Sequence, residues 1–481
     1  MKKKTLITNI FFIALLLKPA ICLSQENDLD ALEFDKVQIE ELFYKKHLNT
    51  DFSPIKTDAN LKNTVEISIS DILATSIENN LNLKMAKQNS KAAKWQFVDS
   101  FANMLPDLQL YAAKQKRDGT FYLNSNFQGA IDETISSAGL RLNYRAFNGG
   151  ASSFLAMAQK YYKKSIEAKE KSSYNLTLLD SVTFYLKLLS ANASLNTELK
   201  ALERAKTNYD LALQYLDSGS GTKFDLLQAD ASLAKAQEAL IIAEANLRKS
   251  QIDLAQHLNL PLDRAFKLAK YKIEKIDLID NNIQFEDFLS SSFANNPDIK
   301  SALEHKKAVA KENLAKNSLF LPSLDLYFDV SGTGQEWAEL YGVTTLGLSA
   351  NYNIGEGLGL NALSQKIKAK ALYEKAKLEY EQEKQNIEKA LRIAYINFQR
   401  SKSILEASQK SYKASQEAYR LSLLRYKNGI EIFADLLDHQ TDLTKAQLVL
   451  ITATIDYNIS QARLLYDMGE INPQQILASG L

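Results

Sequence analysis

The sequence predicts a mostly α-helical fold with a small β part. Three observations carry this prediction: long stretches with apolar residues at heptad spacing, four segments in which apolar and polar residues alternate, and a second half that repeats the first. Only seven prolines and 17 glycines occur among the 481 residues, so few residues interrupt long helices. The net charge of +1 gives no argument for a nucleic-acid partner.

The N-terminal residues have the features of an export signal. Lysines precede an apolar run over residues 6–17, which is too short to span a bilayer, so residues 1–24 predict a secretory signal peptide cleaved after Ser24. Cleavage there would remove Cys22, the only cysteine. The alternative is lipidation of Cys22, although the three residues before it match a lipobox poorly. Residues 25–67 are polar and predict a lead segment without an assigned function.

The remaining chain divides into two similar halves. The stretch that begins at Asp71 is echoed by the stretch that begins at Asp287, and self-similarity on this scale indicates one structural unit used twice. The predicted parts are a first repeat (68–262), a linker (263–283), a second repeat (284–474) and a C-terminal tail (475–481).

Each half predicts a helix of roughly 33 residues, two strands, a helix of 60 to 70 residues, a turn and a helix of about 35 residues. The long helices would span roughly 90 to 100 Å, and the two shorter helices, stacked end to end, would match one long helix in length. In the second half, Leu391, Phe398 and Leu405 begin a strict heptad series that continues through tyrosines to Tyr426, and a small residue follows each member three positions later. This spacing favours left-handed coiling of packed helices. The first half repeats the pattern, with a break at Glu198.

The strand segments have one apolar and one polar face. Leu324, Leu326 and Phe328 alternate with aspartate and tyrosine, and roughly ten-residue segments of this kind suit a transmembrane β-barrel. The alternative is a soluble antiparallel sheet with one wet face. Four strands cannot close a barrel, and open edges are not tolerated in lipid, so several chains must complete one barrel.

A turn joins each long helix to the following shorter helix. Gly219 and Gly429 come just after the last apolar residue of each long helix, where glycine ends a helix without strain. Asp225, Asp435 and Asp438 are predicted in the first turn of the next helix, where a carboxylate meets the positive end of the helix dipole.

With these turns and the twofold order of elements, the sequence resembles the TolC family of outer-membrane efflux and secretion channels over nearly all of residues 68–474. The most specific parts are the order of elements and Tyr426-x-x-Gly429 followed by Asp435-Leu436-Leu437-Asp438. The resemblance implies a homotrimer in the outer membrane of a Gram-negative bacterium, with a 12-stranded β-barrel in the lipid and a 12-helix α-barrel across the periplasm. It also implies a passive export duct of a tripartite efflux or type I secretion system, which works with a periplasmic adaptor and an inner-membrane pump.

The resemblance further implies a gate at the periplasmic tip. Asp435 and Asp438 match an acidic ring at the entrance, where six carboxylates would repel one another and attract cations. Asp225 and Tyr426 match members of the bonds that constrain the closed entrance. The tip residues matched to the adaptor contact are Gly219, Ser220, Gly429 and Ile430.

One position departs from the family. Glu431 stands where better-known members carry an arginine that bonds to the aspartate matched by Asp225, so that salt bridge cannot form here. A Lys223–Glu431 pair between adjacent turns is our hypothesis for a substitute.

Other chemistry is not indicated. The four histidines are scattered without metal-ligand spacing, and no nucleophile and base arrangement occurs, so we expect no enzyme, no cofactor and no metal site. The alternative function is an exported coiled-coil scaffold or adaptor protein of the periplasm, with its strands in a soluble β domain. The cargo is not predictable from these residues.

Overall fold

The computed structural model describes residues 64–478 except 125–126, 270–272, 280–283 and 356, and for residues 121–130 it describes the backbone alone. The predicted signal peptide, Cys22 and nearly all of the lead segment lie outside the described residues.

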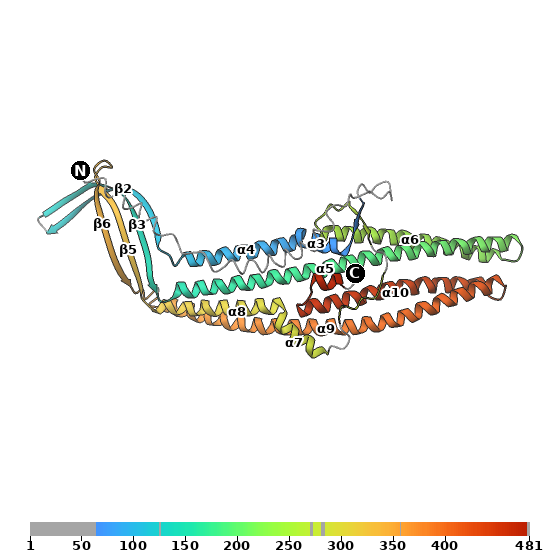
Figure 1. Ribbon diagram of the computed structural model, residues 1–481. Helices are drawn as coiled ribbons and strands as arrows, with labels where there is room; N and C mark the ends of the chain where they lie inside the picture. The colour runs from blue at the N-terminus through green and yellow to red at the C-terminus, as the bar shows by residue number, and fades with distance from the viewer. Residues whose placement is uncertain (1–63, 125–126, 270–272, 280–283, 356, 479–481) are drawn as a thin grey trace. The chain divides into compact units, whose positions relative to one another are not determined.

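The described elements follow the predicted order twice (Figure 1). The first series is β1 (Thr64–Ile67), α3 (Ile69–Asn79), α4 (Leu81–Ala102), β2 (Asp107–Asn124), β3 (Phe127–Asn148), α5 (Ala151–Asp217) and α6 (Lys223–His257). The second is β4 (Ala265–Leu268), α7 (Phe285–Asn295), α8 (Pro297–Ala315), a 3₁₀ turn (Lys316–Phe320), β5 (Ser323–Gly334), β6 (Tyr341–Asn351), α9 (Leu360–Lys427), α10 (Phe433–Met468) and α11 (Pro473–Ala478).

The predicted lengths of the hairpin helices are confirmed. The long helices α5 and α9 have 67 and 68 residues, and α6 and α10 have 35 and 36. Next to the strands, α4, α5, α8 and α9 pack side by side in that order, and towards the turns the order is α6, α5, α10 and α9 (Figure 1).

The prediction of one 33-residue helix at the start of each half was wrong, because asparagine interrupts each helix. The Asn80 side chain caps α4 by accepting from the Leu83 amide at 3.1 Å, and it also donates to the carbonyl of His257 at the end of α6. Asn296 does the same for α8 and donates to the carbonyl of Asp467 near the end of α10. Each asparagine thus joins the end of one shorter helix to the start of the other, which confirms the predicted end-to-end stacking.

His257 is buried at the first of these junctions. Its Nε2 lies 2.9 Å from the Ser181 hydroxyl, and burial lowers the pKa of its imidazole to about 4. The imidazole is therefore neutral at pH 7.

The predicted heptad seam of α9 faces the protein interior. Leu391, Phe398 and Leu405 are buried, and so are the small residues Ala394 and Ser401 beside them. Large side chains therefore alternate with small ones along the line where α9 meets α10, as left-handed coiling requires.

The four amphipathic segments form one antiparallel sheet in the order β2, β3, β5, β6. Arg141 on β3 is opposite Asp329 on β5, and Arg145 is opposite Asp325. The β2–β3 hairpin has strands of 18 and 22 residues and is longer than the roughly ten residues predicted, whereas β5 and β6 have 12 and 11.

A second sheet was not predicted. β1, at the end of the lead segment, pairs in parallel with β4, in the predicted linker. Each strand has only four residues, and their partners are about 200 residues apart in the chain, so neither segment shows enough alternation to be recognised.

The apolar core is divided into two clusters. The larger one gathers residues of α3, the middle of α5, both ends of the linker, and the facing parts of α9 and α10. The smaller one lies at the turns and contains five buried residues, namely Ala212, Ala229, Tyr426, Phe433 and Leu436. None of the described helices is both long and apolar enough to cross a membrane.

Candidate functional site

The two turns end their long helices in the same way. The Ser220 amide donates to the Tyr215 carbonyl and the Ile430 amide donates to the Arg425 carbonyl, both at 2.9 Å. Gly219 and Gly429, with φ of +74° and +70°, take the left-handed conformation that this C-terminal capping motif requires. A methyl group added at either glycine would meet no atom within 4 Å, so the backbone of both turns is open to solvent.

The helices that follow the two turns begin differently. Thr222 and Asp225 form a capping box at the start of α6, where the Asp225 amide donates to the Thr222 hydroxyl and the Thr222 amide donates to the Asp225 carboxylate. The N-cap residue of α10 is Ile432, whose aliphatic side chain cannot accept a hydrogen bond. Asp435 lies in the first turn of α10, but Asp438 lies beyond it. The prediction that the helix dipole stabilises Asp438 was therefore wrong, because that effect falls off within the first turn.

Three aromatic rings join the two hairpins of the chain. The ring of Tyr426 lies 5.6 Å from that of Tyr215 and 5.2 Å from that of Phe433, between ring centroids. The Tyr215 hydroxyl also donates to the carbonyl of Lys427 at 3.4 Å. We call Tyr215, Tyr426 and Phe433 the aromatic latch. Burial, and after it the negative charge of Asp225, raises the pKa of the Tyr426 hydroxyl to about 12.

Glu431 is held within its own hairpin. Its carboxylate pairs with Arg425 Nε at 3.1 Å and accepts from the Ser422 hydroxyl at 2.8 Å, and only 9% of the side chain is exposed. His439 Nε2 lies 3.9 Å from the carboxylate oxygen that accepts from Ser422. Among the described residues of the chain, Lys223 forms no ion pair, so the hypothesised Lys223–Glu431 pair is not formed within one chain.

The remaining predicted residues face solvent at the turns. Asp435, Asp438 and Lys223 are exposed, and the structure gives none of the three a hydrogen bond or ion pair from its side chain to another described residue. Ile430 and Ile432 are 67% and 66% exposed, although both are aliphatic. The second turn therefore presents apolar side chains beside free carboxylates, and the first turn presents Phe224, which is 66% exposed, beside serine, glycine and lysine.

A buried polar layer lies next to the aromatic latch, on the side away from the turns. The Asn208 amide donates to the side-chain oxygen of Gln440, and Arg204 donates to the hydroxyl of Thr444 at 3.0 Å. Three buried polar atoms of this region have no hydrogen-bond partner among residues that the structure places: Arg204 Nε, Asn208 Oδ1 and Gln228 Oε1. Because unsatisfied buried groups cost free energy, the contact between hairpins is weaker here than in an apolar core.

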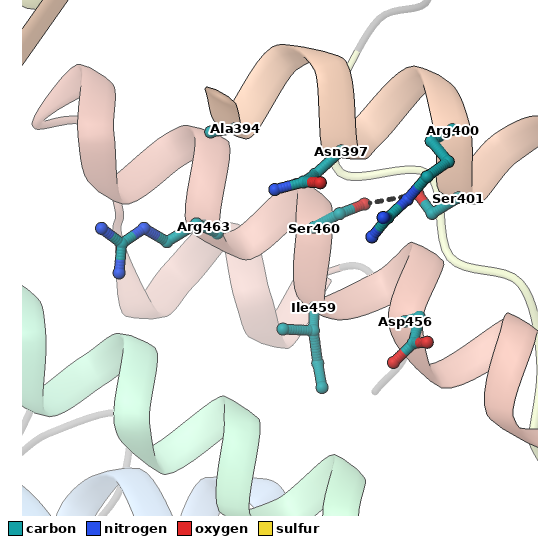
Figure 2. Close-up of a pocket in the computed structure, with 8 residues that line it drawn as sticks. All are labelled: Ala394, Asn397, Arg400, Ser401, Asp456, Ile459, Ser460 and Arg463. Atoms are coloured by element: carbon teal, nitrogen blue, oxygen red, sulfur yellow. Dashed lines mark hydrogen bonds between the residues drawn. The ribbon is translucent and has the colours of Figure 1, made fainter. Parts of the chain in front are cut away.

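Farther from the turns, α9 and α10 enclose a polar groove of about 250 Å³ (Figure 2). Its floor is formed by Ala394 and the hydroxyls of Ser401 and Ser460, which lie 2.9 Å apart. Its rim carries Arg400, Arg463 and Asp456. The linker binds the opposite face of α10, where Tyr457 donates to Asp277. The groove therefore opens on the side of the helices that the linker leaves free.

The polar face of the strands is ordered by ion pairs. Arg141 donates to Asp329 at 2.9 Å, and the Tyr111 hydroxyl donates to the same carboxylate at 3.1 Å. Arg145 pairs with Asp325 at 2.9 Å. These contacts link β2, β3 and β5 across one face of the sheet, while the leucines of the other face point to solvent.

Sequence reasoning missed the partners of Glu431 and the latch residue Tyr215. Ser422 is the small residue three positions after the heptad residue Tyr419, and Arg425 directly precedes Tyr426, but neither position indicates a bond to Glu431. The signal for Tyr215 was present, because it occupies the position in the first turn that Arg425 occupies in the second.

A sequence profile of the family described as outer membrane efflux protein matches residues 72–260 and 288–470. Among curated proteins, toxin and drug export protein A of Aggregatibacter actinomycetemcomitans is 23% identical over 432 residues, which cover 88% of this chain and 89% of that protein. The outer membrane efflux protein BepC of Brucella suis is 22% identical over 361 residues, covering 74% of this chain and 77% of that protein.

Solved structures share the fold. The outer-membrane channel OprN superposes with a TM-score of 0.74 at 19% identity, covering 84% of this chain and 90% of that chain. The CmeC outer membrane channel of Campylobacter jejuni superposes with a TM-score of 0.73 at 18% identity, covering 84% of this chain and 85% of that chain.

Proposed function

This chain belongs to the outer membrane efflux protein family, and from that premise we propose that three copies of it form one export duct that is gated at the paired turns. The protein is an outer-membrane efflux channel and not an enzyme. The trimer, the gate and the partner proteins are the proposed parts.

The observation that carries the proposal is that, in the part of the chain that the structure describes, both layers end in unpartnered edges. α4 and α6 form one edge of the helical layer, and α9 forms the other. Large apolar side chains are exposed on these edge helices, among them Met85 and Trp95 on α4 and Leu363 and Ile367 on α9. A second copy that packs its α9 against α4 and α6 would cover both sets.

The sheet supports the same arrangement. Among the described strands, β2 and β6 each have a neighbour on one side only, and an open strand edge in lipid leaves backbone groups unsatisfied. The apolar face is well exposed on β6, where Leu346 and Leu348 are 77% and 67% exposed, as a lipid-facing surface requires. Two copies would give eight strands, and a barrel of that size is filled by its own side chains. Three copies give about twelve strands and leave room for water inside.

The paired turns are proposed as the periplasmic gate. Asp435 and Asp438 are exposed and free of ion pairs among the described residues, so three copies would bring six carboxylates to one opening. The aromatic latch would hold the two hairpins of each copy together in the closed state. The open backbone at Gly219, Ser220, Gly429 and Ile430 is proposed to meet a periplasmic adaptor protein, which connects the duct to an inner-membrane pump.

The test is whether the edges assemble. We expect the detergent-purified protein to have about three times the mass of one chain by light scattering, and to conduct ions in a planar bilayer. Met85→Glu with Trp95→Glu should abolish the trimer. Leu199→Glu, at an apolar position of the inner helix α5 that is 46% exposed, is the control and should leave the trimer intact.

The outcome also distinguishes the duct from the second candidate function. An exported coiled-coil scaffold or adaptor would stay soluble and monomeric without detergent, and that result would refute the duct. A trimer that survives both glutamates on α4 would show that the edges are not the interface.

A further inference from the structure

Positive charge is concentrated in the half of the helical layer that lies next to the strands. This half contains twenty lysines, no arginine and ten acidic residues, whereas the half next to the turns contains 19 basic and 18 acidic residues. The part next to the strands comprises residues 81–102, 151–175, 297–316 and 360–384. The part next to the turns comprises residues 176–217, 223–257, 385–427 and 433–468. We call the part next to the strands the lysine-rich zone. Its surplus of ten charges contrasts with the net charge of +1 for the whole chain.

Most of these lysines are not neutralised by the chain itself. Within the described residues, five of the twenty form ion pairs. The five are Lys163, Lys307, Lys375, Lys377 and Lys384. The other fifteen have no anionic partner in this part of the chain, and among them Lys84, Lys316 and Lys366 donate hydrogen bonds to uncharged groups.

The lysines follow single faces of their helices. On α4, Lys84, Lys87, Lys91 and Lys94 are spaced three or four residues apart, which places them on one face. On α9, Lys366, Lys370, Lys377 and Lys384 also share a face.

The lysine face of α9 is the side on which α7 packs. Lys384 Nζ lies 5.5 Å from the centre of the Phe293 ring of α7. In the proposed trimer, three copies of α7 and of the linker would block the interior of the duct if they faced inwards. This face is therefore the outer wall, and the lysines on it face the periplasm.

The distance from the strands indicates what can reach these lysines. Lys366 and Lys384 follow the first residue of α9 by six and 24 residues, so they lie about 9 and 36 Å along the helix. Electrostatic attraction to lipid head groups is screened within about 8 Å at physiological ionic strength. Most of the zone is thus too deep in the periplasm for the membrane surface to be its partner.

We propose that the lysine-rich zone binds the carboxylate-bearing polymer of the cell wall, peptidoglycan, where the duct passes through it. The inference rests on the proposed function, because the trimer and its orientation place the zone on the outside of a periplasmic duct. Three copies would present about thirty surplus positive charges to a meshwork whose peptides carry carboxylates, and multivalent contact of this kind is strong at low salt.

The test is co-sedimentation of the full-length detergent-solubilised protein with purified peptidoglycan sacculi. The variant changes six exposed lysines of the zone, each without an ion pair among the described residues, to glutamine: Lys87, Lys91, Lys169, Lys171, Lys300 and Lys370. The matched control changes six exposed lysines of the other half to glutamine: Lys200, Lys206, Lys235, Lys249, Lys410 and Lys413. Both variants lose the same charge, so only its location differs.

We expect the wild type and the control to sediment with sacculi. We expect the zone variant to bind them at least about tenfold more weakly. Equal binding by the two variants would overturn the proposal, as would a wild type that does not sediment. Tighter binding of the wild type to vesicles of anionic phospholipid than to sacculi would also overturn it. Channel conductance in a planar bilayer is measured for all three proteins, and a wild type without conductance would refute the duct rather than this inference.

Discussion

Removal of the central ring of the aromatic latch should open the gate. Tyr426→Ala removes two ring contacts, with Tyr215 at 5.6 Å and with Phe433 at 5.2 Å, from a cluster of only five buried residues. Aromatic pairs contribute about 0.5 to 1.5 kcal/mol each beyond their burial, and the loss of a buried aromatic side chain adds to this. Only the contact with Tyr215 crosses between the hairpins, so we expect about 1.5 kcal/mol less free energy holding them together, which is about a tenfold change in the ratio of open to closed.

The assay is single-channel recording in planar bilayers, where Tyr426→Ala should spend far more time in a high-conductance state than the wild type. Tyr412→Ala is the control, because Tyr412 is a half-buried member of the same heptad series that lies outside the tip cluster. Tyr426→Phe keeps the ring and removes the hydroxyl, for which the structure gives no hydrogen bond to a described residue, and it should behave like the wild type. If Tyr426→Phe opens the channel as much as Tyr426→Ala does, a bond of the hydroxyl holds the gate, and the argument from ring packing is refuted.

Three further perturbations test other parts of the structure. Asp435→Ala with Asp438→Ala should abolish block of the channel by multivalent cations, measured in the same bilayers, and unaltered block would exclude these carboxylates from the pore. Asn296→Ala should lower the free energy of unfolding by about 1 to 3 kcal/mol, because it removes the cap of α8 and the hydrogen bond to the Asp467 carbonyl. Thermal melting measures this change, and Asn361→Ala, at an exposed position, is the control. The pKa of His257 is lowered to about 4, so the unfolded chain binds a proton that the folded chain does not between pH 6.5 and 4. Stability should therefore fall by about 3 kcal/mol as the pH drops through this window, and a melting temperature of His257→Gln that depends on pH as steeply as that of the wild type would contradict the assignment.

Patterns that repeat along one helix or strand could be predicted from the sequence, whereas contacts between distant segments could not. The heptads from Leu391 to Tyr426 and the alternation around Leu326 depend on local periodicity, and the structure places them as expected. The breaks at Asn80 and Asn296 depend on carbonyl groups 177 and 171 residues away, and asparagine by itself is only moderately unfavourable inside a helix. The doubled asparagines in both halves were visible in the sequence, but their meaning appears only when the end of the other helix is placed beside them.

The same limit applies to the site. The glycines of the turns and the first-turn position of Asp435 follow from local capping chemistry. The pairing of Glu431 with Arg425 does not, because the two residues lie on opposite sides of a turn and meet only when its geometry is known. The aromatic latch joins residues 211 positions apart, and the equivalence of the two repeats alone does not say that their tips touch.

The division of the core explains how the turns could move while the protein stays folded. The larger cluster, around Leu188, Phe398 and Tyr457, is tied to the linker by hydrogen bonds such as that from Tyr457 to Asp277. Between it and the latch, the layer of Arg204, Asn208 and Gln440 contains buried polar atoms without partners, so little free energy is lost when the hairpins separate there. Local opening needs only the free energy of the contacts that break. Between this layer and the turns, these are mainly the contacts of the five buried residues of the tip cluster. A gate that opens at the turns is therefore expected to pivot at the polar layer, and the larger cluster would keep the helices aligned above it.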